Sequence, residues 1–288
     1  MRQPYFTGVC TALVTPFLNG HINYPMVDVL IRRQRDAGIS AVVLSGTTGE
    51  SATLSDGEKL ELFQRGKASA GDNMLVIAGT GSNNTEHAVA LSKAAQEAGA
   101  DALLVVSPYY NKANSEGLVA HYLAIAHAVK IPVIIYNVPS RTGVDIPVSV
   151  YQTLSRIPNI VGVKEASVSM EKILQIFAEC SPEFTVWSGN DDLTVPILSL
   201  GGKGVISVVS NVLPTEVNAM TRSALDGDFD TAASIQCKLY PLTRFLFSDV
   251  NPIPVKAAMQ HIGYDCGDCR LPLTRLRSEH YTTLRKIL

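Results

Sequence analysis

One lysine stands at the end of an otherwise apolar run, a position that could give its amine a chemical role. Lys164 follows Ile160-Val161-Gly162-Val163, and the two-residue period of a strand predicts that it shares a face with Ile160 and Gly162. If Val161 and Val163 face covering helices, the amine points into the interior. A buried ammonium is either paired with a carboxylate or shifted toward the neutral amine, which is a nucleophile. The residues alone leave both interpretations open.

A tyrosine at the end of the preceding apolar run could assist such an amine. Tyr136 shares a strand face with Ile134, and neighbouring strands lie about 4.8 Å apart. A phenol beside an amine can donate and accept protons during carbinolamine and imine formation. A strand tyrosine is also commonly just packed, so Tyr136 alone does not decide the chemistry.

A glycine-rich stretch offers groups that could bind a small carboxylate. The run Gly46-Thr47-Thr48-Gly49-Glu50-Ser51 directly follows another apolar segment. Its two glycines permit a tight turn that exposes backbone amides and two hydroxyl groups. An ordinary turn into a helix would explain the same composition.

Eight short apolar runs must position these residues. They are Val9–Val14, Ala41–Leu44, Leu75–Ala78, Ala102–Val106, Pro132–Tyr136, Ile160–Lys164, Phe184–Trp187 and Val205–Val208. Their starts advance by roughly 28 residues on average, enough for a strand, a loop and a helix. Richness in Val, Ile and Leu without strict alternation is typical of parallel strands covered on both faces.

The intervening segments have recognisable helix ends. Asn23 can cap a helix, Ser55 and Glu58 form a capping box, and a further helix starts at Thr85. The pattern predicts an α/β fold, a closed (β/α)8 barrel over residues 1–224, with its active site at the carboxyl ends of the strands. Residues 225–288 contain no comparable strand and predict a C-terminal helical appendage, with helices over Asp228–Phe247, Pro252–Ile262 and Ser278–Leu288. An open doubly wound sheet is the alternative, disfavoured because no GxGxxG follows the first run.

The composition excludes several classes of partner. The 288-residue chain has a formal net charge of -2 and a pI of about 6.3, so it has no basic footprint for nucleic acid or an anionic membrane. No apolar run reaches the roughly 18 residues that a membrane helix needs. The first residues, MRQPYFTG, lack the apolar stretch of a signal peptide. We expect a cytoplasmic protein.

Neither the cysteines nor a pair of acidic residues predicts a metal site. The five cysteines are an odd number and mostly far apart, which favours reduced thiols. Cys266 and Cys269 form one CxxC, but a zinc site normally needs two more ligands, so a structural role is favoured over a metal or redox role. Asp191 and Asp192 lack a third ligand at useful spacing, which favours turn or capping roles.

An ordered set of motifs along nearly the whole chain resembles the dihydrodipicolinate synthase family, which lies within the class I pyruvate aldolases together with N-acetylneuraminate lyase. The motifs are Thr11–Phe17, Gly46–Ser51, Gly79–Gly81, Pro108–Asn111, Tyr136–Gly143, Val163–Ala166, Ser188–Asp191 and Gly204–Ser207. The resemblance implies that Lys164 forms a Schiff base with pyruvate. The resulting enamine would attack the aldehyde of aspartate 4-semialdehyde, and no metal or organic cofactor is required.

The resemblance also implies a role for each site residue. Tyr136, Thr47 and Tyr110 would form a proton relay, with Tyr110 supplied by the neighbouring subunit of a tight dimer. Thr48 and nearby amides would hold the pyruvate carboxylate. Further implied contacts are Arg141, for the carboxylate of the semialdehyde, and the Ile206 carbonyl, near the lysine. Family members are commonly tetramers, so a homotetramer formed from two dimers is expected.

This function has two alternatives. One is a sibling aldolase acting on a 2-keto sugar acid such as N-acetylneuraminate or 2-keto-3-deoxygluconate. Sialic acid lyases usually carry Ser-Thr where this chain has Thr47-Thr48, and they lack an arginine at position 141, which favours the synthase. The other is a silent pyruvate-binding paralogue, which is disfavoured because every expected catalytic position is filled.

The family's lysine-feedback site is only partly matched. The matching residues are Ser51, Ala52, Leu54, Asn83 and Tyr109. Asp56 and Lys59 stand where lysine-sensitive relatives tend to have histidines, and His87 replaces a glutamate that would bind the effector's ammonium. An added cation and a lost anion disfavour a cationic ligand, so we predict weak or absent inhibition by lysine.

Overall fold

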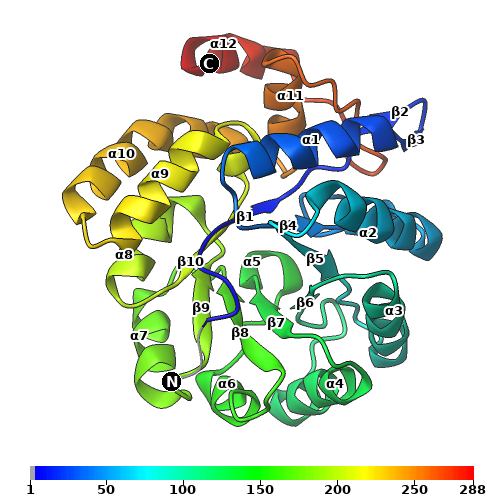
Figure 1. Cartoon of the computed structure of the whole chain (residues 1–288), viewed down its shortest axis with the longest axis vertical. Coiled ribbons are helices and arrows are strands. Elements are labelled where there is room, and N and C mark those ends of the chain that lie inside the picture. Colours follow the sequence, from blue (N-terminus) through cyan, green and yellow to red (C-terminus); the bar gives the residue numbers. More distant parts are fainter. Residues whose placement is uncertain (1–3) are drawn as a thin grey trace.

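Eight parallel strands close into one barrel in the order β1, β10, β9, β8, β7, β6, β5, β4 in the computed structural model, which describes residues 4–288 (Figure 1). The barrel strands are β1 (Gly8–Ala12), β4 (Ala41–Leu44), β5 (Leu75–Gly79), β6 (Ala102–Val106), β7 (Val133–Asn137), β8 (Ile160–Glu165), β9 (Thr185–Ser188) and β10 (Gly204–Ser207). Each predicted apolar run overlaps one of these strands. The closed barrel is therefore confirmed, and the open sheet is excluded.

Helices follow the strands and cover the outside of the barrel. They are α1 (Tyr24–Asp36), α2 (Asp56–Ala70), α3 (Thr85–Glu97), α4 (Ser115–Ala128), α6 (Val148–Leu154), α7 (Met170–Glu179), α8 (Thr194–Ser199) and α9 (Pro214–Leu225). The short helix α5 (Pro139–Thr142), directly after β7, lies instead near the centre of the barrel in Figure 1. The predicted caps are confirmed: the Asn23 side chain accepts from the Met26 amide, and Ser55 and Glu58 form a reciprocal capping box. A small hairpin of β2 (Phe17–Leu18) and β3 (His21–Ile22) was not predicted.

A bulge in β8 changes which of its side chains face the barrel axis. The pairing with β7 passes from Ile160 directly to Gly162, so Val161 is an extra residue. Ile160 packs in the outer core and Val161 beside the inner one. The expectations that Ile160 shares the face of Lys164, and that Val161 faces the helices, are therefore wrong. Alternation resumes after the bulge, and Val163 packs outward, which leaves Lys164 facing inward as predicted.

The amino end of the barrel is closed by an aromatic pair. Phe6 and Trp187 stack with ring centroids 4.7 Å apart, and the Trp187 indole donates to the Phe6 carbonyl at 3.3 Å. Both side chains belong to the inner apolar cluster of the barrel. The polar side chains that face the axis therefore lie toward the carboxyl ends of the strands, where barrel active sites form.

The last part of the chain forms the predicted helical appendage. It contains α10 (Phe229–Leu246), α11 (Ile253–His261), a short 3₁₀ turn η4 (Ser278–His280) and α12 (Tyr281–Ile287). Figure 1 shows α10 beside α9, and α11 and α12 beyond α1. A domain division at residues 224 and 225 stays a prediction. Within residues 4–288, no helix is both long enough and apolar enough to cross a bilayer.

Candidate active site

Lys164 and Tyr136 lie side by side at the carboxyl ends of β8 and β7. They are direct register partners, and the Lys164 Nζ atom lies 4.3 Å from the centroid of the Tyr136 ring. Both side chains are buried, at 5% and 7% exposure. Among the described residues, Lys164 makes no salt bridge within 4.0 Å of a carboxylate. Of the two interpretations of Lys164, the geometry therefore favours a nucleophilic amine over an ammonium paired with a carboxylate.

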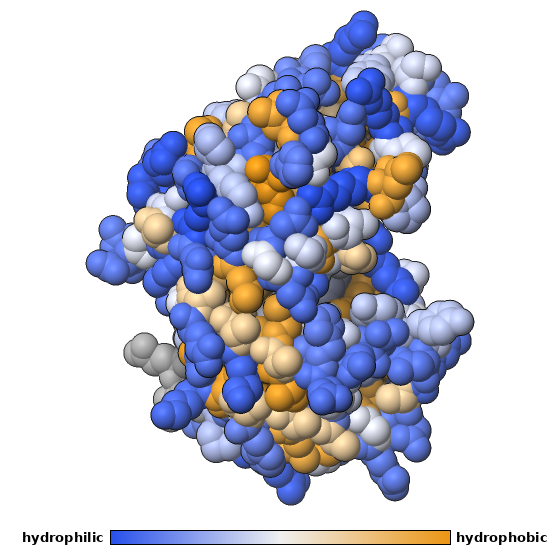
Figure 2. All heavy atoms as spheres, turned by 90° about the vertical axis from the view of Figure 1, so that its right-hand side faces the viewer, coloured by the Kyte–Doolittle hydropathy of each residue, from blue (hydrophilic) through white to orange (hydrophobic). Residues whose placement is uncertain are grey.

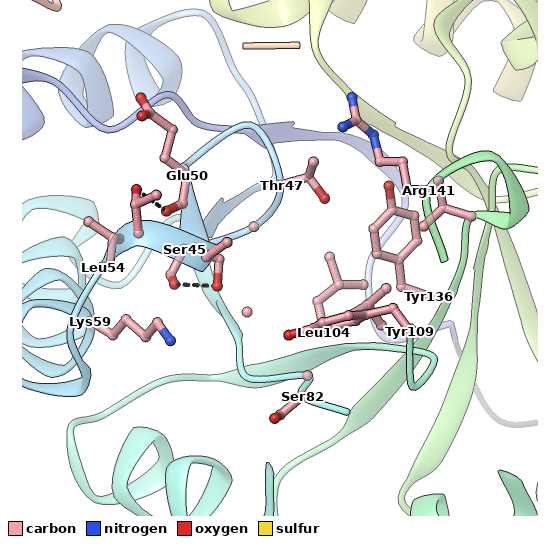
Figure 3. Close-up of a pocket in the computed structure, with 18 of the residues that line it drawn as sticks. Ser45, Thr47, Glu50, Leu54, Lys59, Ser82, Leu104, Tyr109, Tyr136 and Arg141 are labelled. Carbon is pink, nitrogen blue, oxygen red and sulfur yellow. Dashed lines mark hydrogen bonds between the residues drawn. The ribbon is translucent and has the colours of Figure 1, made fainter. Parts of the chain in front are cut away.

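Lys164 lines a cavity of about 170 Å³. Its wall includes Thr47 and Thr48 from the turn after β4, Tyr136, and Arg141 from α5. Figure 3 shows Thr47 and Tyr136 facing the same space from opposite walls. Four of the residues predicted from the sequence therefore meet around Lys164 in one hollow.

The turn after β4 is short and held by its own backbone. The Glu50 amide donates to the Thr47 carbonyl at 3.1 Å, and the Ser51 amide donates to the Gly46 carbonyl at 3.2 Å. A side chain at Gly49 would meet the Leu13 carbonyl at 3.1 Å, so the residue must stay small. The turn thus fixes the positions of Thr47 and Thr48 in the cavity wall.

Asn251 is a wall residue that the sequence did not predict. It comes from the segment between α10 and α11, is 5% exposed, and donates from Nδ2 to the Thr48 hydroxyl at 2.9 Å. Its Oδ1 atom is buried with no hydrogen-bond partner among the described residues. A contact between residues 203 positions apart leaves no local signal in the sequence.

Arg141 lies at the open rim of the cavity. Its side chain is exposed, and its Nη2 atom makes only a long hydrogen bond, 3.4 Å, to the Asn251 carbonyl. A guanidinium that is free to turn at a rim can grip a carboxylate with two parallel hydrogen bonds. Figure 3 shows Arg141 beside Tyr136 at this edge.

A buried carboxylate fixes the neighbouring end of β10. Asp191 accepts from the Ser207 hydroxyl at 2.5 Å and from the Val208 and Val209 amides at 2.9 and 3.3 Å. Burial raises the pKa of Asp191, while these hydrogen bonds and the positive charge of Lys164 act in the opposite direction. Asp191 thus bonds the end of β10 and the two residues after it, whereas the turn or capping roles expected for Asp191 and Asp192 stay a prediction. Its contacts also hold Ile206, a fully buried residue of the inner cluster, in place.

A second buried carboxylate, adjacent to Lys164 in sequence, points outward into a hydrogen-bonded network. Glu165 accepts from the Asn137 amide at 2.7 Å, from the Tyr151 hydroxyl at 3.0 Å and from the Ser167 backbone at 2.8 Å. Burial, together with the Glu165 charge, raises the pKa of Tyr151 well above its usual value. This network stiffens the end of β8 that carries the lysine.

Tyr110 is not brought into the cavity by its own chain. It lies in the loop between β6 and α4, is 89% exposed, and has a φ of 71°. A left-handed backbone at a bulky residue is uncommon and clusters at functional loops. Its role in a relay stays a prediction that depends on a second subunit.

The residues of the expected effector site line a larger groove of about 720 Å³ that continues from the cavity past Thr47 and Tyr136. Seven of them contribute to its wall: Ser51, Ala52, Leu54, Asp56, Lys59, His87 and Tyr109. The eighth, Asn83, accepts from Asn111 through its carbonyl at 3.0 Å nearby. The structure therefore gathers this set in one region, although no ligand tests its role.

The charges in this groove are already paired. The Asp56 carboxylate lies 2.9 Å from the His87 Nε2 atom and 3.5 Å from the Lys59 Nζ atom. The hydrogen bond from His87, followed by the charges of His87 and Lys59, lowers the pKa of Asp56. Figure 3 shows Lys59 reaching toward the groove from α2. An ammonium ligand would have to compete with the Lys59 ammonium for this carboxylate.

Neither the CxxC nor the two aspartates form a metal site in the structure. Across residues 4–288, no three His, Cys, Asp or Glu side chains converge in a way that could hold a metal ion. Burial raises the pKa of both Cys266 and Cys269 to about 12. Both thiols therefore stay protonated near neutral pH, which fits the structural role favoured from the sequence.

Comparisons with known proteins agree with this geometry. The sequence model of the dihydrodipicolinate synthetase family matches residues 5–288. The 4-hydroxy-tetrahydrodipicolinate synthase of Acetivibrio thermocellus is 45% identical over 288 residues, which is all of this chain and 98% of the relative.

Two solved structures are closely similar. One is dihydrodipicolinate synthase from Cyanidioschyzon merolae with lysine bound, with a TM-score of 0.96 and 42% identity over 99% and 98% of the two chains. The other is a monomeric dihydrodipicolinate synthase variant, with a TM-score of 0.96 and 39% identity over 98% and 96%. The fold, the site and the full-length match together place this chain in the dihydrodipicolinate synthetase family.

Proposed function

We propose that the protein is a 4-hydroxy-tetrahydrodipicolinate synthase, which condenses pyruvate with L-aspartate 4-semialdehyde through a Schiff base on Lys164. The single observation that carries this function is the Lys164 amine, buried beside Tyr136 and facing a small cavity walled by two threonines. This places the reaction in the synthesis of diaminopimelate and lysine.

The first half of the reaction needs an amine, an acid-base group and a carboxylate site. The Lys164 nitrogen attacks the ketone carbon of pyruvate, and loss of water from the carbinolamine leaves an iminium. Tyr136, whose ring lies against the amine, is placed to carry protons in these steps. Thr48 and the amides of its turn hold the pyruvate carboxylate without a full positive charge.

The second half uses the iminium as an electron sink. The pyruvate methyl group loses a proton to give an enamine, whose carbon attacks the aldehyde of the semialdehyde. Arg141 at the rim holds the distal carboxylate of that substrate. The amine of the semialdehyde then displaces Lys164 and closes the six-membered ring, which returns the free lysine.

The active assembly is a homotetramer of two tight dimers, in which Tyr110 enters the neighbouring subunit's site and completes a relay with Thr47 and Tyr136. Two observations support a partner at this loop. Tyr110 is 89% exposed on a left-handed backbone. Figure 2 shows a band of apolar side chains on the face of the molecule that carries α2, α3 and α4. Sedimentation of the wild type and Tyr110→Ala would test the assembly.

Turnover with different acceptors distinguishes the synthase from its sibling aldolases. We expect condensation of pyruvate with aspartate semialdehyde and no cleavage of N-acetylneuraminate or 2-keto-3-deoxygluconate. Preferred cleavage of either sugar acid would contradict the synthase while leaving the Schiff base intact. A failure to trap pyruvate on Lys164 by hydride reduction would contradict both.

A further inference from the structure

An ion pair joins the C-terminal appendage to the threonine turn of the active site. The Lys256 Nζ atom of α11 lies 2.7 Å from the Glu50 Oε1 atom, and the two side chains are 3% and 1% exposed. The second carboxylate oxygen accepts from the Arg270 amide at 2.8 Å. Lys256 also donates to the Asp268 carbonyl at 3.1 Å. Every charged atom of the pair is therefore partnered within the protein.

An aromatic ring packs against both cations of this cluster. The Lys256 Nζ atom lies 4.3 Å from the centre of the Phe17 ring, and the Arg270 guanidinium lies 4.4 Å from it. The Arg270 guanidinium also donates to Glu58 at the start of α2. Elements from the beginning, the second βα unit and the end of the chain thus converge on Glu50.

The conformation of Glu50 shows that the turn is held in place by this cluster. Its φ of 57° lies in the left-handed region, which costs free energy at a residue with a side chain. Figure 3 shows its carboxylate pointing away from the space between Thr47 and Tyr136. Glu50 is two positions after Thr48, and both of its carboxylate oxygens are bonded to the appendage, so these contacts act on the turn.

A second contact from the appendage reaches the same turn. Asn251, which lies just before α11, donates to the Thr48 hydroxyl at 2.9 Å. Lys256 lies five positions farther along and belongs to α11 itself. The appendage therefore contacts the turn at two points, at Thr48 through Asn251 and at Glu50 through Lys256 of α11.

We propose that Lys256 and Glu50 are positioning residues for pyruvate, and that the C-terminal appendage thereby sets the affinity of the threonine turn for the 2-oxo acid carboxylate. This inference rests on the proposed function, because it assigns the turn to pyruvate. Neither side chain touches the substrate. Both act by fixing the position of the turn that carries Thr47 and Thr48 and by keeping that turn rigid.

The test must separate positioning from stability, because breaking a buried ion pair is strongly destabilising whereas replacing both partners is commonly neutral. The test variant is therefore the double substitution Glu50→Gln/Lys256→Met, which leaves no unpaired charge. The readout is the pyruvate concentration that half-saturates hydride trapping on Lys164, together with KM for pyruvate and for the semialdehyde.

We expect the double variant to melt close to the wild-type temperature while its half-saturating pyruvate concentration rises about tenfold, because small displacements of binding groups are costly. KM for the semialdehyde should change by less than about twofold, because the turn is proposed to bind pyruvate alone. A loss of affinity for only one substrate indicates that the groups binding that substrate were displaced. A folded double variant with wild-type pyruvate half-saturation would show that the pair is only structural.

Two further variants keep the result decisive. Lys256→Gln retains a donor for the Glu50 carboxylate and should shift pyruvate half-saturation in the same direction by a smaller factor. If the double variant does not fold, an unchanged half-saturating pyruvate concentration in folded Lys256→Gln overturns the proposal.

The control variant, Lys67→Met, breaks the 2.7 Å ion pair between Lys67 and Asp101 at the amino end of β5 and β6. This variant should leave the half-saturating pyruvate concentration unchanged. If that concentration rises as much in Lys67→Met as in the double variant, the effect comes from general destabilisation and not from positioning.

Failure of this inference is distinguishable from failure of the proposed function. Trapping that occurs equally in the wild type and the double variant rejects the positioning role alone. Absence of trapping in the wild type rejects the Schiff base itself.

Discussion

The Lys164 amine lies against the face of the Tyr136 ring, 4.3 Å from its centroid, because the two residues are register partners on adjacent strands. Parallel pairing at the carboxyl ends of two barrel strands sets this distance without any loop. Rigid elements hold reacting groups more precisely than loops do. The pair is therefore a fixed feature of the barrel, and only the substrates need to move.

Replacing Tyr136 by phenylalanine tests the acid-base role of its hydroxyl. The ring would still pack against Lys164, so folding should be nearly unchanged, whereas kcat should fall by about a hundredfold or more. Steady-state kinetics and a thermal melt measure the two effects. A Tyr136→Phe enzyme with more than half of the wild-type kcat would rule out proton transfer by this hydroxyl.

Arg141 is expected to affect one substrate and not the other. Arg141→Ala should raise KM for the semialdehyde by about tenfold or more, because a bidentate charge-assisted contact is lost. Arg141→Lys should recover only part of the loss, since an ammonium cannot present the same fork. Hydride trapping of pyruvate should be unchanged in both variants. A selective loss of pyruvate trapping would show that Arg141 binds the carboxylate of pyruvate and not that of the semialdehyde.

The barrel and the inward position of Lys164 were predictable because both depend on patterns within single βα units. The face of Ile160 was predicted wrongly, since a bulge at Val161 adds one residue that strand periodicity does not reveal. The loop sites at Thr47 and Arg141 followed from strand ends and from family resemblance. Lys256 and Asn251 could not be predicted, because their partners lie 206 and 203 positions away and only the fold brings them together.

A buried histidine should make folding stability depend on pH. His121 on α4 is 3% exposed, its Nδ1 atom lies 2.9 Å from the Thr85 hydroxyl, and its Nε2 atom has no partner among the described residues. Burial lowers the pKa of His121 from 6.5 to about 4. The unfolded chain therefore binds a proton between these values and the folded protein does not, so stability falls as the pH falls from 6.5 to 4.

The expected loss across this window is on the order of 2 to 3 kcal/mol, given that one pKa unit corresponds to about 1.4 kcal/mol. His121→Asn removes the titrating group and should flatten this part of the profile. Urea unfolding at several pH values, with wild type and variant compared pairwise, measures the difference. Parallel profiles for the two proteins would contradict the prediction.

Inhibition by free lysine should be weak or absent. The groove that would receive the effector already holds the Lys59 ammonium beside the Asp56 carboxylate, whose other oxygen is bonded to His87, and Lys59 would repel a further ammonium. Initial rates over a range of lysine concentrations measure the effect, and half-inhibition at submillimolar lysine would contradict it. The double substitution Lys59→His/His87→Glu should increase sensitivity by at least about tenfold, because it removes one fixed cation and adds an anion.

The most direct test of the Schiff base on Lys164 is to trap it as a stable covalent adduct. The wild-type enzyme is reduced with borohydride in the presence of pyruvate, digested and mapped by mass spectrometry, with Lys164→Ala as the control. We expect a single modified lysine, Lys164, carrying one pyruvate less one water and plus two hydrogens, and no modification in the control. An unmodified Lys164 in the wild type, or an adduct on another lysine that persists in Lys164→Ala, would contradict it.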